Sequence, residues 1–364
     1  MTRAIVSLGS NLEPRTVYLA RARAALAALP ETRVVAASSV LETEPVDVPD
    51  AYADLTFLNQ VVVCETDLGA QDFARRMHAI EDALGRVRTV RNGPRTIDLD
   101  LVDFGGLVLE TPELTLPHPR AHERDFVMRP LAELGLALNR EVGPGFVRDQ
   151  LARGNRVLLV VRHSERPKID GEDKTFGAAL PLTPEGERLC LAYGRLLKGA
   201  ADDDVQFRAS PLRRTVLTAQ FIAEGLGIKV SEIPTDAAIG NGSAFIADEL
   251  QVWELFRDGR FFEKMGDYLE RGTQAGFNAL GPSTKAFEDY CVSQFTGRLG
   301  VFTSHDVYLA AYAKGSGILA SVTKDNWPRF LDAIAIVLRP DGSCDRAFVR
   351  AGLTDGICGV GAKA

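Results

Sequence analysis

The segment from Gly85 to Asp100 concentrates charged side chains that could bind a polyphosphate. Arginines at positions 86, 88, 91 and 95 fall within ten residues that contain no acidic side chain. Because a guanidinium is planar and permanently charged, such a cluster suits phosphate oxygens. Asp98 and Asp100 lie two residues apart on a segment that reads as a strand, so their carboxylates would share one face. Neighbouring carboxylates suit Mg²⁺, which combines one or two of them with substrate phosphates.

A solvated basic loop beside an ordinary amphipathic strand would explain the same residues without any chemistry. Two like charges on one strand face are mildly unfavourable, however, unless a cation lies nearby. The adjoining arginines therefore favour a metal and phosphate site. The sequence contains no Walker-type G-x-x-x-x-G-K-[ST] segment, which excludes a P-loop kinase.

Three apolar runs in the C-terminal part of the chain are each followed within five residues by histidine or arginine. The carboxyl ends of parallel strands form the ligand-binding edge of an open α/β sheet, so we expect these side chains to meet. A neutral imidazole can attack phosphorus if arginines neutralise the oxygens, and a carboxylic acid must then protonate the leaving oxygen. Any one of these motifs alone would read as an ordinary helix start. The residues are Arg162, His163 and Arg166 after 157–161, Arg214 after 205–209, and His305 with Asp306 after 299–303.

The hydrophobic periodicity predicts the elements that position these residues. In the first part of the chain, strands separated by two helical patterns indicate an α+β sandwich. In the second part, continuous apolar strands alternate with helices, which predicts a mainly parallel sheet covered on both faces, an α/β three-layer arrangement. The predicted strands are 5–8, 34–41, 57–63, 96–102 and 107–109, then 157–161, 205–209 and 299–303; the helices are 16–29 and 73–84, then 183–197, 212–224 and 307–314.

Glycine and proline interrupt a weakly periodic stretch near residue 145, and Gly105-Gly106 offers a hairpin turn before residues 107–109. We therefore expect a first domain at 1–145, a linker at 146–155 and a second domain at 156–364.

The composition indicates an ordinary globular protein of two domains. The 364 residues include 46% hydrophobic and 25% charged side chains, with a net charge of −7. The acidic balance argues against nucleic acid or anionic membrane as a partner, so we expect small-molecule substrates. The five cysteines are widely spaced, which predicts neither disulfides nor zinc and favours the cytoplasm. The oligomeric state is not predicted.

The run Gly93-Pro94-Arg95-Thr96-Ile97-Asp98-Leu99-Asp100 carries a family resemblance, together with Ser7-Leu8-Gly9-Ser10-Asn11 and Leu116-Pro117-His118. Over about residues 3 to 136 the chain resembles the 6-hydroxymethyl-7,8-dihydropterin pyrophosphokinases of folate biosynthesis. The resemblance implies a ferredoxin-like fold and transfer of pyrophosphate from ATP to the hydroxymethyl group of a reduced pterin, giving AMP.

The same resemblance implies roles for individual residues. Asp98 and Asp100 would hold Mg²⁺. The nucleotide and phosphate path would be lined by Glu81, Arg86, Arg88, Arg95, His118 and Arg124, with Arg86 and Arg95 acting in catalysis. The pterin pocket would comprise Thr43, Val46, Phe57, Asn59 and Phe126.

The second constellation resembles the histidine phosphatase superfamily over about residues 156 to 315. The resemblance implies that His163 is the nucleophile, that Arg162 and Arg214 bind phosphate, and that His305 stabilises the transferring group, with Arg166 also among the catalytic residues. The pairs Arg166-Pro167 and His305-Asp306 are closer to the acid-phosphatase branch, which nominates Asp306 as proton donor. Glu249 is the alternative donor, since the other branch takes its acid from a mid-domain segment.

Together these observations predict a bifunctional enzyme, a pterin pyrophosphokinase joined to a phosphatase that works through a phosphohistidine. Ser164 stands where glycine commonly follows the nucleophile. One alternative is therefore a monofunctional pyrophosphokinase whose C-terminal domain only binds or regulates. Another is a phosphomutase, which returns the phosphoryl group to a second hydroxyl.

Overall fold

The computed structural model describes residues 1–45, 48–52, 54–87, 93–136, 138–170, 173–199, 201, 204–257 and 259–353. The chain divides into two compact units, Met1–Asn139 and Arg140–Ala364. Each unit has its own sheet and its own buried apolar clusters, so each is described by itself.

An antiparallel sheet forms the centre of the first unit. Its main path runs β2 (Thr32–Ala37), β4 (Phe57–Thr66), β1 (Thr2–Ser10) and β5 (Asp98–Phe104), and β3 (Leu41–Thr43) also pairs with β4. The predicted strand 34–41 is thus divided in two. The break follows Ala37, where the Ser38 hydroxyl accepts a hydrogen bond from the Val61 N–H at 3.0 Å and replaces a regular strand pairing.

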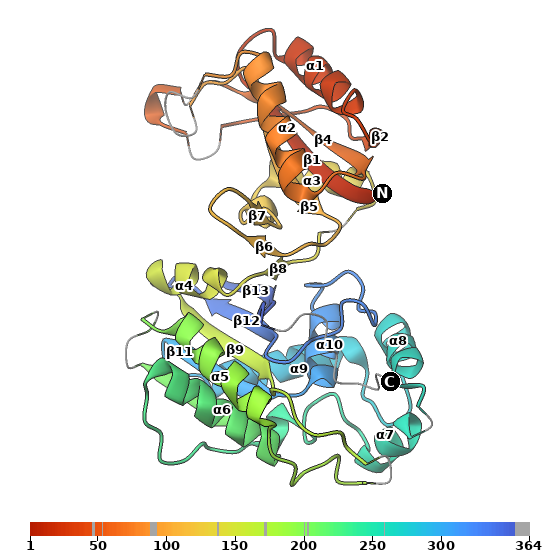
Figure 1. Ribbon diagram of the computed structural model, residues 1–364, viewed down its shortest axis with the longest axis vertical. Helices are drawn as coiled ribbons and strands as arrows, with labels where there is room; N and C mark the ends of the chain where they lie inside the picture. Colours follow the sequence, from red (N-terminus) through yellow and green to blue (C-terminus); the bar gives the residue numbers. More distant parts are fainter. Residues whose placement is uncertain are drawn as a thin grey trace. The chain divides into compact units, whose positions relative to one another are not determined.

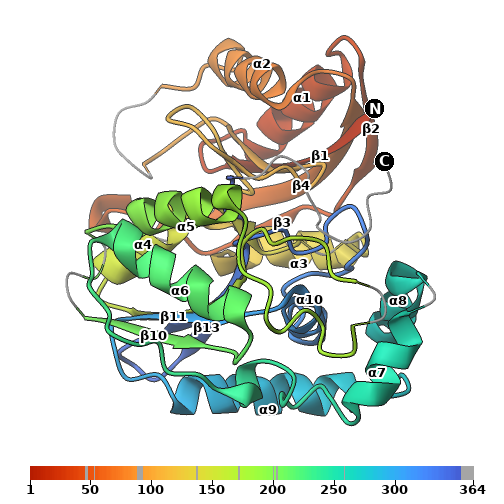
Figure 2. The same cartoon turned by 60° about the horizontal axis from the view of Figure 1, so that its bottom comes forward.

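Helices cover both faces of this sheet because the strand residues alternate between two apolar clusters. Ala4, Val6 and Leu8 face α1 (Arg15–Ala27) and α2 (Ala70–Ala83), whereas Ile5 packs with residues of α3 (Asp125–Glu133). Figure 2 shows α1 and α2 on one side of β1 and β4, with α3 on the other. The α+β arrangement was predicted; α3, which contains Pro130, was not.

The hairpin expected at Gly105-Gly106 has a different partner. Both glycines have positive φ, 59° and 73°, and Leu107 N–H donates to the Phe104 carbonyl at 2.9 Å, so a turn is present. The following strand, β6 (Leu109–Glu110), nevertheless pairs with β7 (Thr115–Leu116) rather than with β5. One edge of β5 pairs with β1, and on its other edge the Val102 carbonyl accepts the His118 N–H at 2.9 Å.

A mixed sheet forms the centre of the second unit, in the order β10-β11-β9-β12-β13-β8. The three predicted strands β9 (Arg156–Arg162), β10 (Val205–Ala209) and β11 (Leu299–Ser304) are parallel. Two strands were not predicted from the sequence: β12 (Ala333–Leu338), which is antiparallel to β9, and β13 (Cys344–Val349), which is antiparallel to β12. The short β8 (Glu141–Val142) pairs parallel to β13. The sheet is therefore mixed: β10, β11 and β9 are parallel at one side, β12 is antiparallel to both of its neighbours, and β8 is parallel to β13 at the other edge.

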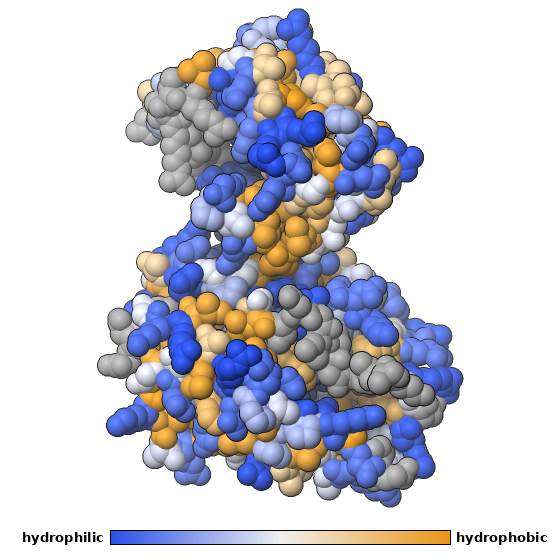
Figure 3. Space-filling view, in the orientation of Figure 1, coloured by the Kyte–Doolittle hydropathy of each residue, from blue (hydrophilic) through white to orange (hydrophobic). Residues whose placement is uncertain are grey.

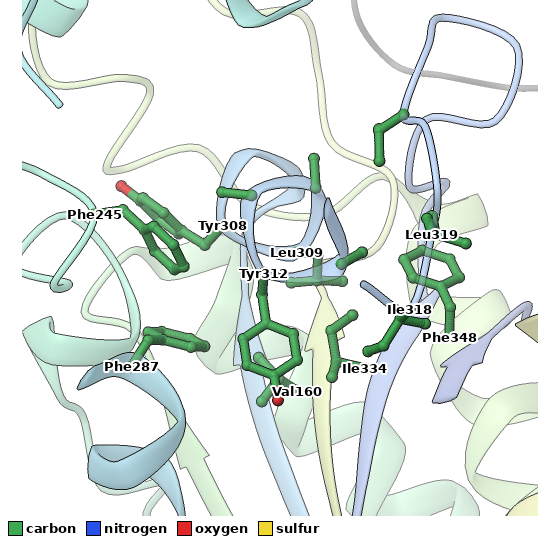
Figure 4. Packing of buried hydrophobic residues seen from close by; sticks show 14 of the residues in the cluster. Val160, Phe245, Phe287, Tyr308, Leu309, Tyr312, Ile318, Leu319, Ile334 and Phe348 are labelled. Atoms are coloured by element: carbon green, nitrogen blue, oxygen red, sulfur yellow. The ribbon is translucent and has the colours of Figure 1, made fainter. Parts of the chain in front are cut away.

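Alternating residues of β9 again divide between two cores. Val157, Leu159 and Val161 pack toward α4 (Gly145–Ala152), α5 (Pro184–Leu197) and α6 (Arg213–Leu226), whereas Leu158 and Val160 pack toward α9 (Leu280–Ser293) and α10 (Asp306–Gly315). Figure 4 shows this second core, with Leu309 and Tyr312 of α10 beside Val160 and Ile334. Two further helices, α7 (Glu249–Phe256) and α8 (Phe261–Arg271), lie on the side of α10 away from α5 and α6 (Figures 1 and 2). Short 3₁₀ turns occur at Asp50–Tyr52, Ala121–Glu123 and Ala237–Ile239.

The stretch expected as a linker at 146–155 is instead part of the second unit. The chain divides between Asn139 and Arg140, and α4 occupies most of the expected linker. Val147 and Leu151 of this helix are completely buried against the sheet. Because burial of these side chains stabilises the helix, the glycine and proline before it mark its start rather than a flexible connection.

Surface hydropathy is mixed in both units. Figure 3 shows hydrophilic residues interspersed with smaller hydrophobic groups on the visible face of each. Among the helices of the described residues, none combines the length and apolar character needed to cross a bilayer.

Candidate active sites

Three residues that lie side by side on neighbouring strands form the base of the first site. Gly9 of β1 lies opposite Asn59 of β4 and also opposite Asp98 of β5. A Cβ at position 9 would lie 3.3 Å from the Asn59 Oδ1 and 4.0 Å from the Asp98 Cβ. Because Gly9 has no side chain, the space above the sheet between the Asn59 amide and the Asp98 carboxylate stays open. Asp100 lies on the same face of β5, opposite Ser7.

Three arginines neutralise the two carboxylates. Arg86 Nη1 lies 2.5 Å from Asp98 Oδ1, and Arg95 Nη1 lies 2.7 Å from Asp98 Oδ2. On Asp100, Oδ2 pairs with Arg124 Nη1 at 3.0 Å. The predicted cluster thus comes together, including Arg124 from beyond the Gly85–Asp100 segment. Arg88 was also predicted for the phosphate path, but it lies outside the described residues.

Glu81 stabilises this cluster through buried contacts with Arg86 and with strand β5. Its side chain is 0% exposed, its Oε1 accepts the Leu99 N–H at 2.8 Å, and it forms an ion pair with Arg86. This carboxylate therefore holds Arg86 and strand β5 together. A direct contact of Glu81 with nucleotide, which the resemblance implied, would require this buried group to become exposed.

His118 approaches Asp100 from the segment after β7. Its Nδ1 accepts the Arg120 N–H at 3.2 Å, so the neutral ring carries its proton on Nε2, which lies 4.0 Å from Asp100 Oδ2. Burial lowers the pKa of His118, and the Asp100 carboxylate acts in the opposite direction. His118 therefore lies at the edge of the carboxylate pair; its contact with nucleotide, which the resemblance implies, stays a prediction.

The predicted pterin residues that are described line the same hollow as the carboxylates. Asn59 Nδ2 donates to Thr43 Oγ1 at 2.8 Å, which fixes the amide orientation. The Phe57 ring lies 5.2 Å from the Arg95 guanidinium carbon, and the Phe126 ring 5.4 Å from that of Arg124. Val46 lies outside the described residues. The hollow is also lined by Ser7, Glu44 and Arg120, which the sequence analysis missed.

The donor set of this site fits a cation that is shared with a substrate. Within the part of the chain that the structure describes, no group of three or more His, Cys, Asp or Glu side chains could hold a metal by themselves. Mg²⁺ requires only one or two protein carboxylates when phosphates supply further oxygens. Asp98 and Asp100 provide that minimum on one strand face, which the sequence spacing predicted.

The second site lies where β9, β10 and β11 end. The strands are in register, with Ala209 opposite Thr303 and Thr303 opposite Val161. The residues that follow are consequently brought together, and the rings of His163 and His305 have centroids 5.4 Å apart. All three predicted segments therefore meet at one sheet edge.

His163 has the protonation state that a nucleophile needs. Its Nδ1 lies 2.8 Å from the Ser164 carbonyl, which can only accept, so Nδ1 carries the proton and Nε2 keeps its lone pair. The ring is 2% exposed. Burial lowers the pKa of His163 well below its ordinary value, and the Arg214 charge acts in the same direction. The imidazole is therefore neutral over the physiological pH range.

The surrounding arginines retain unused donors. Arg162 donates from Nη1 to the Pro328 carbonyl at 2.6 Å, and Arg214 from Nη1 to the Phe176 carbonyl at 2.9 Å. The buried Nε atoms of Arg162, Arg166 and Arg214, however, find no hydrogen-bond partner among the described residues. Burial lowers the pKa of Arg214 to about 10. Because a buried unpaired donor is costly, three of them around one histidine indicate an anion site.

His305 is held by residues after β10. Its Nε2 lies 2.8 Å from Ser210 Oγ, and its Nδ1 lies 3.4 Å from Arg214 Nη2. Since the arginine can only donate, Nδ1 accepts and Nε2 carries the proton. Burial, followed by the Arg214 charge, lowers the pKa of His305 well below its ordinary value.

The two candidate proton donors differ in their surroundings. Asp306 Oδ2 accepts from Trp327 Nε1 at 3.1 Å and lies 3.1 Å from Arg162 Nη2. This carboxylate is thus held by two donors, in a contact with Trp327 that the sequence did not indicate. Glu249 is exposed at the start of α7 and lines the same hollow. Ser164, the residue in place of glycine, directs its hydroxyl to the Gly186 carbonyl at 2.8 Å.

Comparison with known proteins agrees with the division into two units. The family described as 7,8-dihydro-6-hydroxymethylpterin-pyrophosphokinase matches residues 5–136, and the histidine phosphatase superfamily (branch 1) matches residues 158–237. The latter match corrects the expectation that the second unit is closer to the acid-phosphatase branch.

Two curated relatives are 2-amino-4-hydroxy-6-hydroxymethyldihydropteridine pyrophosphokinases. The protein from Bacillus subtilis is 41% identical over 138 residues, covering 38% of this chain and 81% of the relative. The protein from Methylorubrum extorquens is 42% identical over 153 residues, covering 42% of this chain and 94% of the relative. A solved phosphoserine phosphatase from Entamoeba histolytica is 18% identical, with a TM-score of 0.34, covering 53% of this chain and 96% of its own.

Proposed function

Because this chain belongs, through residues 5–136, to the 7,8-dihydro-6-hydroxymethylpterin-pyrophosphokinase family and also carries a histidine phosphatase superfamily domain, we propose that it is a bifunctional enzyme of folate biosynthesis. The first unit transfers pyrophosphate from ATP to 6-hydroxymethyl-7,8-dihydropterin and releases AMP. The second unit hydrolyses a phosphoester through a phosphohistidine. One observation carries the first activity: three arginines and two carboxylates surround the open space above Gly9.

In the first reaction the chain positions two substrates and neutralises charge. The acceptor ring binds at Asn59 and Phe126, so that its hydroxymethyl group faces Asp98 and Asp100. The hydroxyl oxygen attacks the β-phosphorus of ATP, the bond from that phosphorus to the bridging oxygen breaks, and AMP leaves with that oxygen. The hydroxyl proton passes to solvent.

Charge neutralisation comes from the arginines that now hold the carboxylates. Arg86, Arg95 and Arg124 can turn from Asp98 and Asp100 toward phosphate oxygens when the nucleotide enters. Mg²⁺ held by Asp98 and Asp100 would supply further positive charge to the triphosphate. Glu81 stays paired with Arg86 while that guanidinium exchanges Asp98 for phosphate oxygens, and it thus acts as a positioning residue.

In the second reaction His163 Nε2 attacks the phosphorus of a phosphate monoester. The bond from phosphorus to the alcohol oxygen breaks, and a carboxylic acid donates a proton to that oxygen. Water then attacks the phosphohistidine, so inorganic phosphate leaves and the free imidazole returns. The unpaired Nε atoms of Arg162, Arg166 and Arg214 bind the phosphoryl oxygens, and His305 stabilises the group in transfer by exchanging the Ser210 contact of its Nε2 proton for a phosphoryl oxygen.

We assign the proton donor to Glu249 rather than to Asp306. Asp306 accepts from Trp327 and is paired with Arg162, so protonating it would weaken both contacts. Within the described part of the chain Glu249 has no ion pair with an arginine, and the branch 1 match also favours a mid-domain acid. Asp306 then serves to hold Arg162.

The finer structural assignments follow from the same proposal. We take the first unit as ferredoxin-like and the second, which begins near Arg140, as a three-layer α/β domain. Packing of α1 and α2 against one face of the antiparallel sheet supports the first assignment, and helices on both faces of the second sheet support the second. Free thiols at Cys64, Cys190, Cys291 and Cys344 suit a reducing compartment, so we assign the enzyme to the cytoplasm.

Two labelling experiments test the two activities. With γ-labelled ATP, the label should appear in the pterin product and the released nucleotide should be AMP. With a labelled phosphodonor, wild-type protein should gain an acid-labile label that His163→Ala lacks. A panel of phosphorylated metabolites should then release inorganic phosphate. Absence of label and of phosphate release across the panel would favour a second unit that only binds, and transfer to another hydroxyl would favour a mutase.

A further inference from the structure

The hollow around His163 is larger than a phosphate group requires. Its cavity volume is about 430 Å³, which lies in the range of sites that enclose whole small-molecule ligands. It extends from the ends of β9 and β11 to α7, the first residue of α8 and the segment around Phe176. Figures 1 and 2 show α7 and α8 beside α10, the helix that starts at Asp306. The site therefore has room for the alcohol part of an ester.

Beyond the phosphate-binding groups, the lining consists largely of apolar and aromatic side chains. Contacts between neighbouring rings fix the aromatic side chains of this lining. The ring centroids of Phe256 and Phe261 are 4.8 Å apart, and those of Phe261 and Trp327 are 5.3 Å apart. The apolar members of the lining include Ile169, Phe176, Ile246, Val252, Trp253, Phe256 and Phe261.

Trp253 is also fixed by two cations. The Lys174 ammonium lies 5.2 Å and the Arg257 guanidinium carbon 5.1 Å from its ring centroid, and the side chain is only 7% exposed. The charged residues of the lining outside the catalytic cluster have both signs, for example Lys168 and Asp170. Because these charges have both signs, they do not favour a charged alcohol part of either sign. The apolar side chains of the lining instead favour an alcohol part with a large apolar surface.

We propose that this site takes phosphate monoesters whose alcohol carries an aromatic ring system, in preference to small polar phosphates. The inference rests on the proposed function, since the phosphate must lie at Arg162, Arg166 and Arg214. A phosphate held there leaves the rest of the ligand within the hollow, against Trp253 and Phe256. Burial of a two-ring system against such a wall improves binding by about 100-fold over a glycerol ester.

Binding to a protein that cannot turn over tests the ligand class directly. In His163→Ala, calorimetry would compare 1-naphthyl phosphate, glycerol 1-phosphate and inorganic phosphate. The naphthyl ester should bind about 100-fold more tightly than the glycerol ester. Adding Phe256→Ala should weaken the naphthyl ester about 10-fold and leave inorganic phosphate unchanged, which also shows that the variant folds. Phe221→Ala, which truncates a partly buried ring of the opposite core, should change neither.

The outcomes separate this inference from the proposed function. Equal affinities for the two esters, or equal effects of Phe256→Ala on naphthyl ester and inorganic phosphate, would overturn the aromatic preference even if wild type hydrolyses esters. Tight naphthyl binding without phosphate release by wild type would support the ligand class and reject the hydrolase. If neither ester nor inorganic phosphate binds, the anion site and the inference both fail.

Discussion

The ion pair between Arg86 and Glu81 allows a quantitative test of how the first site is built. Arg86 is 13% exposed and Glu81 is 0% exposed, so this is a buried pair. Removing one partner of such a pair takes an ion-pair contact from the buried charge that remains and typically costs about 3 to 5 kcal/mol. Arg86→Met should therefore lower the free energy of unfolding of the first unit by about 3 kcal/mol or more.

The double variant Glu81→Gln with Arg86→Met separates charge from packing. The glutamine oxygen can still accept the Leu99 N–H that Glu81 now accepts at 2.8 Å. Because no buried charge remains, we expect most of the lost stability to return, while pyrophosphokinase activity stays low without Arg86. Arg75→Met is the matched control, since its pair with Asp72 is exposed and should matter by less than about 1 kcal/mol.

The assay uses the positions of the two tryptophans, Trp253 and Trp327, which both belong to the second unit. Urea unfolding followed by far-ultraviolet circular dichroism reports on both units, whereas tryptophan fluorescence reports on the second. Arg86→Met should shift the dichroism transition and leave the fluorescence transition in place. A loss no greater than that of Arg75→Met would refute the assignment of Glu81 as a buried support for Arg86.

Three further predictions concern the two sites. Gly9→Ala should raise the KM for the pterin about 10-fold, with a smaller effect on ATP, because the new Cβ would lie 3.3 Å from Asn59 Oδ1; steady-state AMP formation measures both. Burial lowers the pKa of His163 and of His305 in the folded protein. Below about pH 6.5, the ordinary histidine pKa, the unfolded chain therefore binds more protons than the folded chain. Unfolding followed by tryptophan fluorescence should accordingly show stability falling as the pH drops below that value, with a shallower slope in His305→Asn; a flat profile would contradict the burial argument. Inorganic phosphate at 100 times its Kd should stabilise the second unit by about 2.7 kcal/mol, and Arg214→Met should abolish this gain, as thermal unfolding with and without phosphate would show.

Local periodicity predicted the elements whose pattern is complete in one segment. The helix of Phe73 and Met77, and the apolar strand β9, were found for this reason. The run Ala333–Leu338 was missed because a short apolar run is compatible with either a helix or a strand. Its role as β12 is decided by pairing with β9, which is distant in sequence.

The site residues that could be predicted are those whose own side-chain chemistry and local sequence context suggest a role, without knowledge of their contacts in the fold. Asp98, Asp100 and His163 are examples, since charge or position after an apolar strand identified them. The contacts that hold these side chains in place join segments that are distant in the sequence, and a single sequence does not reveal such contacts. Asp306 with Trp327, and Gly9 between Asn59 and Asp98, are contacts of this kind.

We expect Asp98, together with its arginines, to be required for pyrophosphate transfer in the first unit. The most direct measurement is the rate of AMP formation from ATP, Mg²⁺ and 6-hydroxymethyl-7,8-dihydropterin by wild type, Asp98→Ala and the exposed control Asp72→Ala. We predict AMP as the nucleotide product, loss of at least about 100-fold in Asp98→Ala and a wild-type rate in the control. ADP as product, or an Asp98→Ala rate within a few-fold of wild type, would contradict the account.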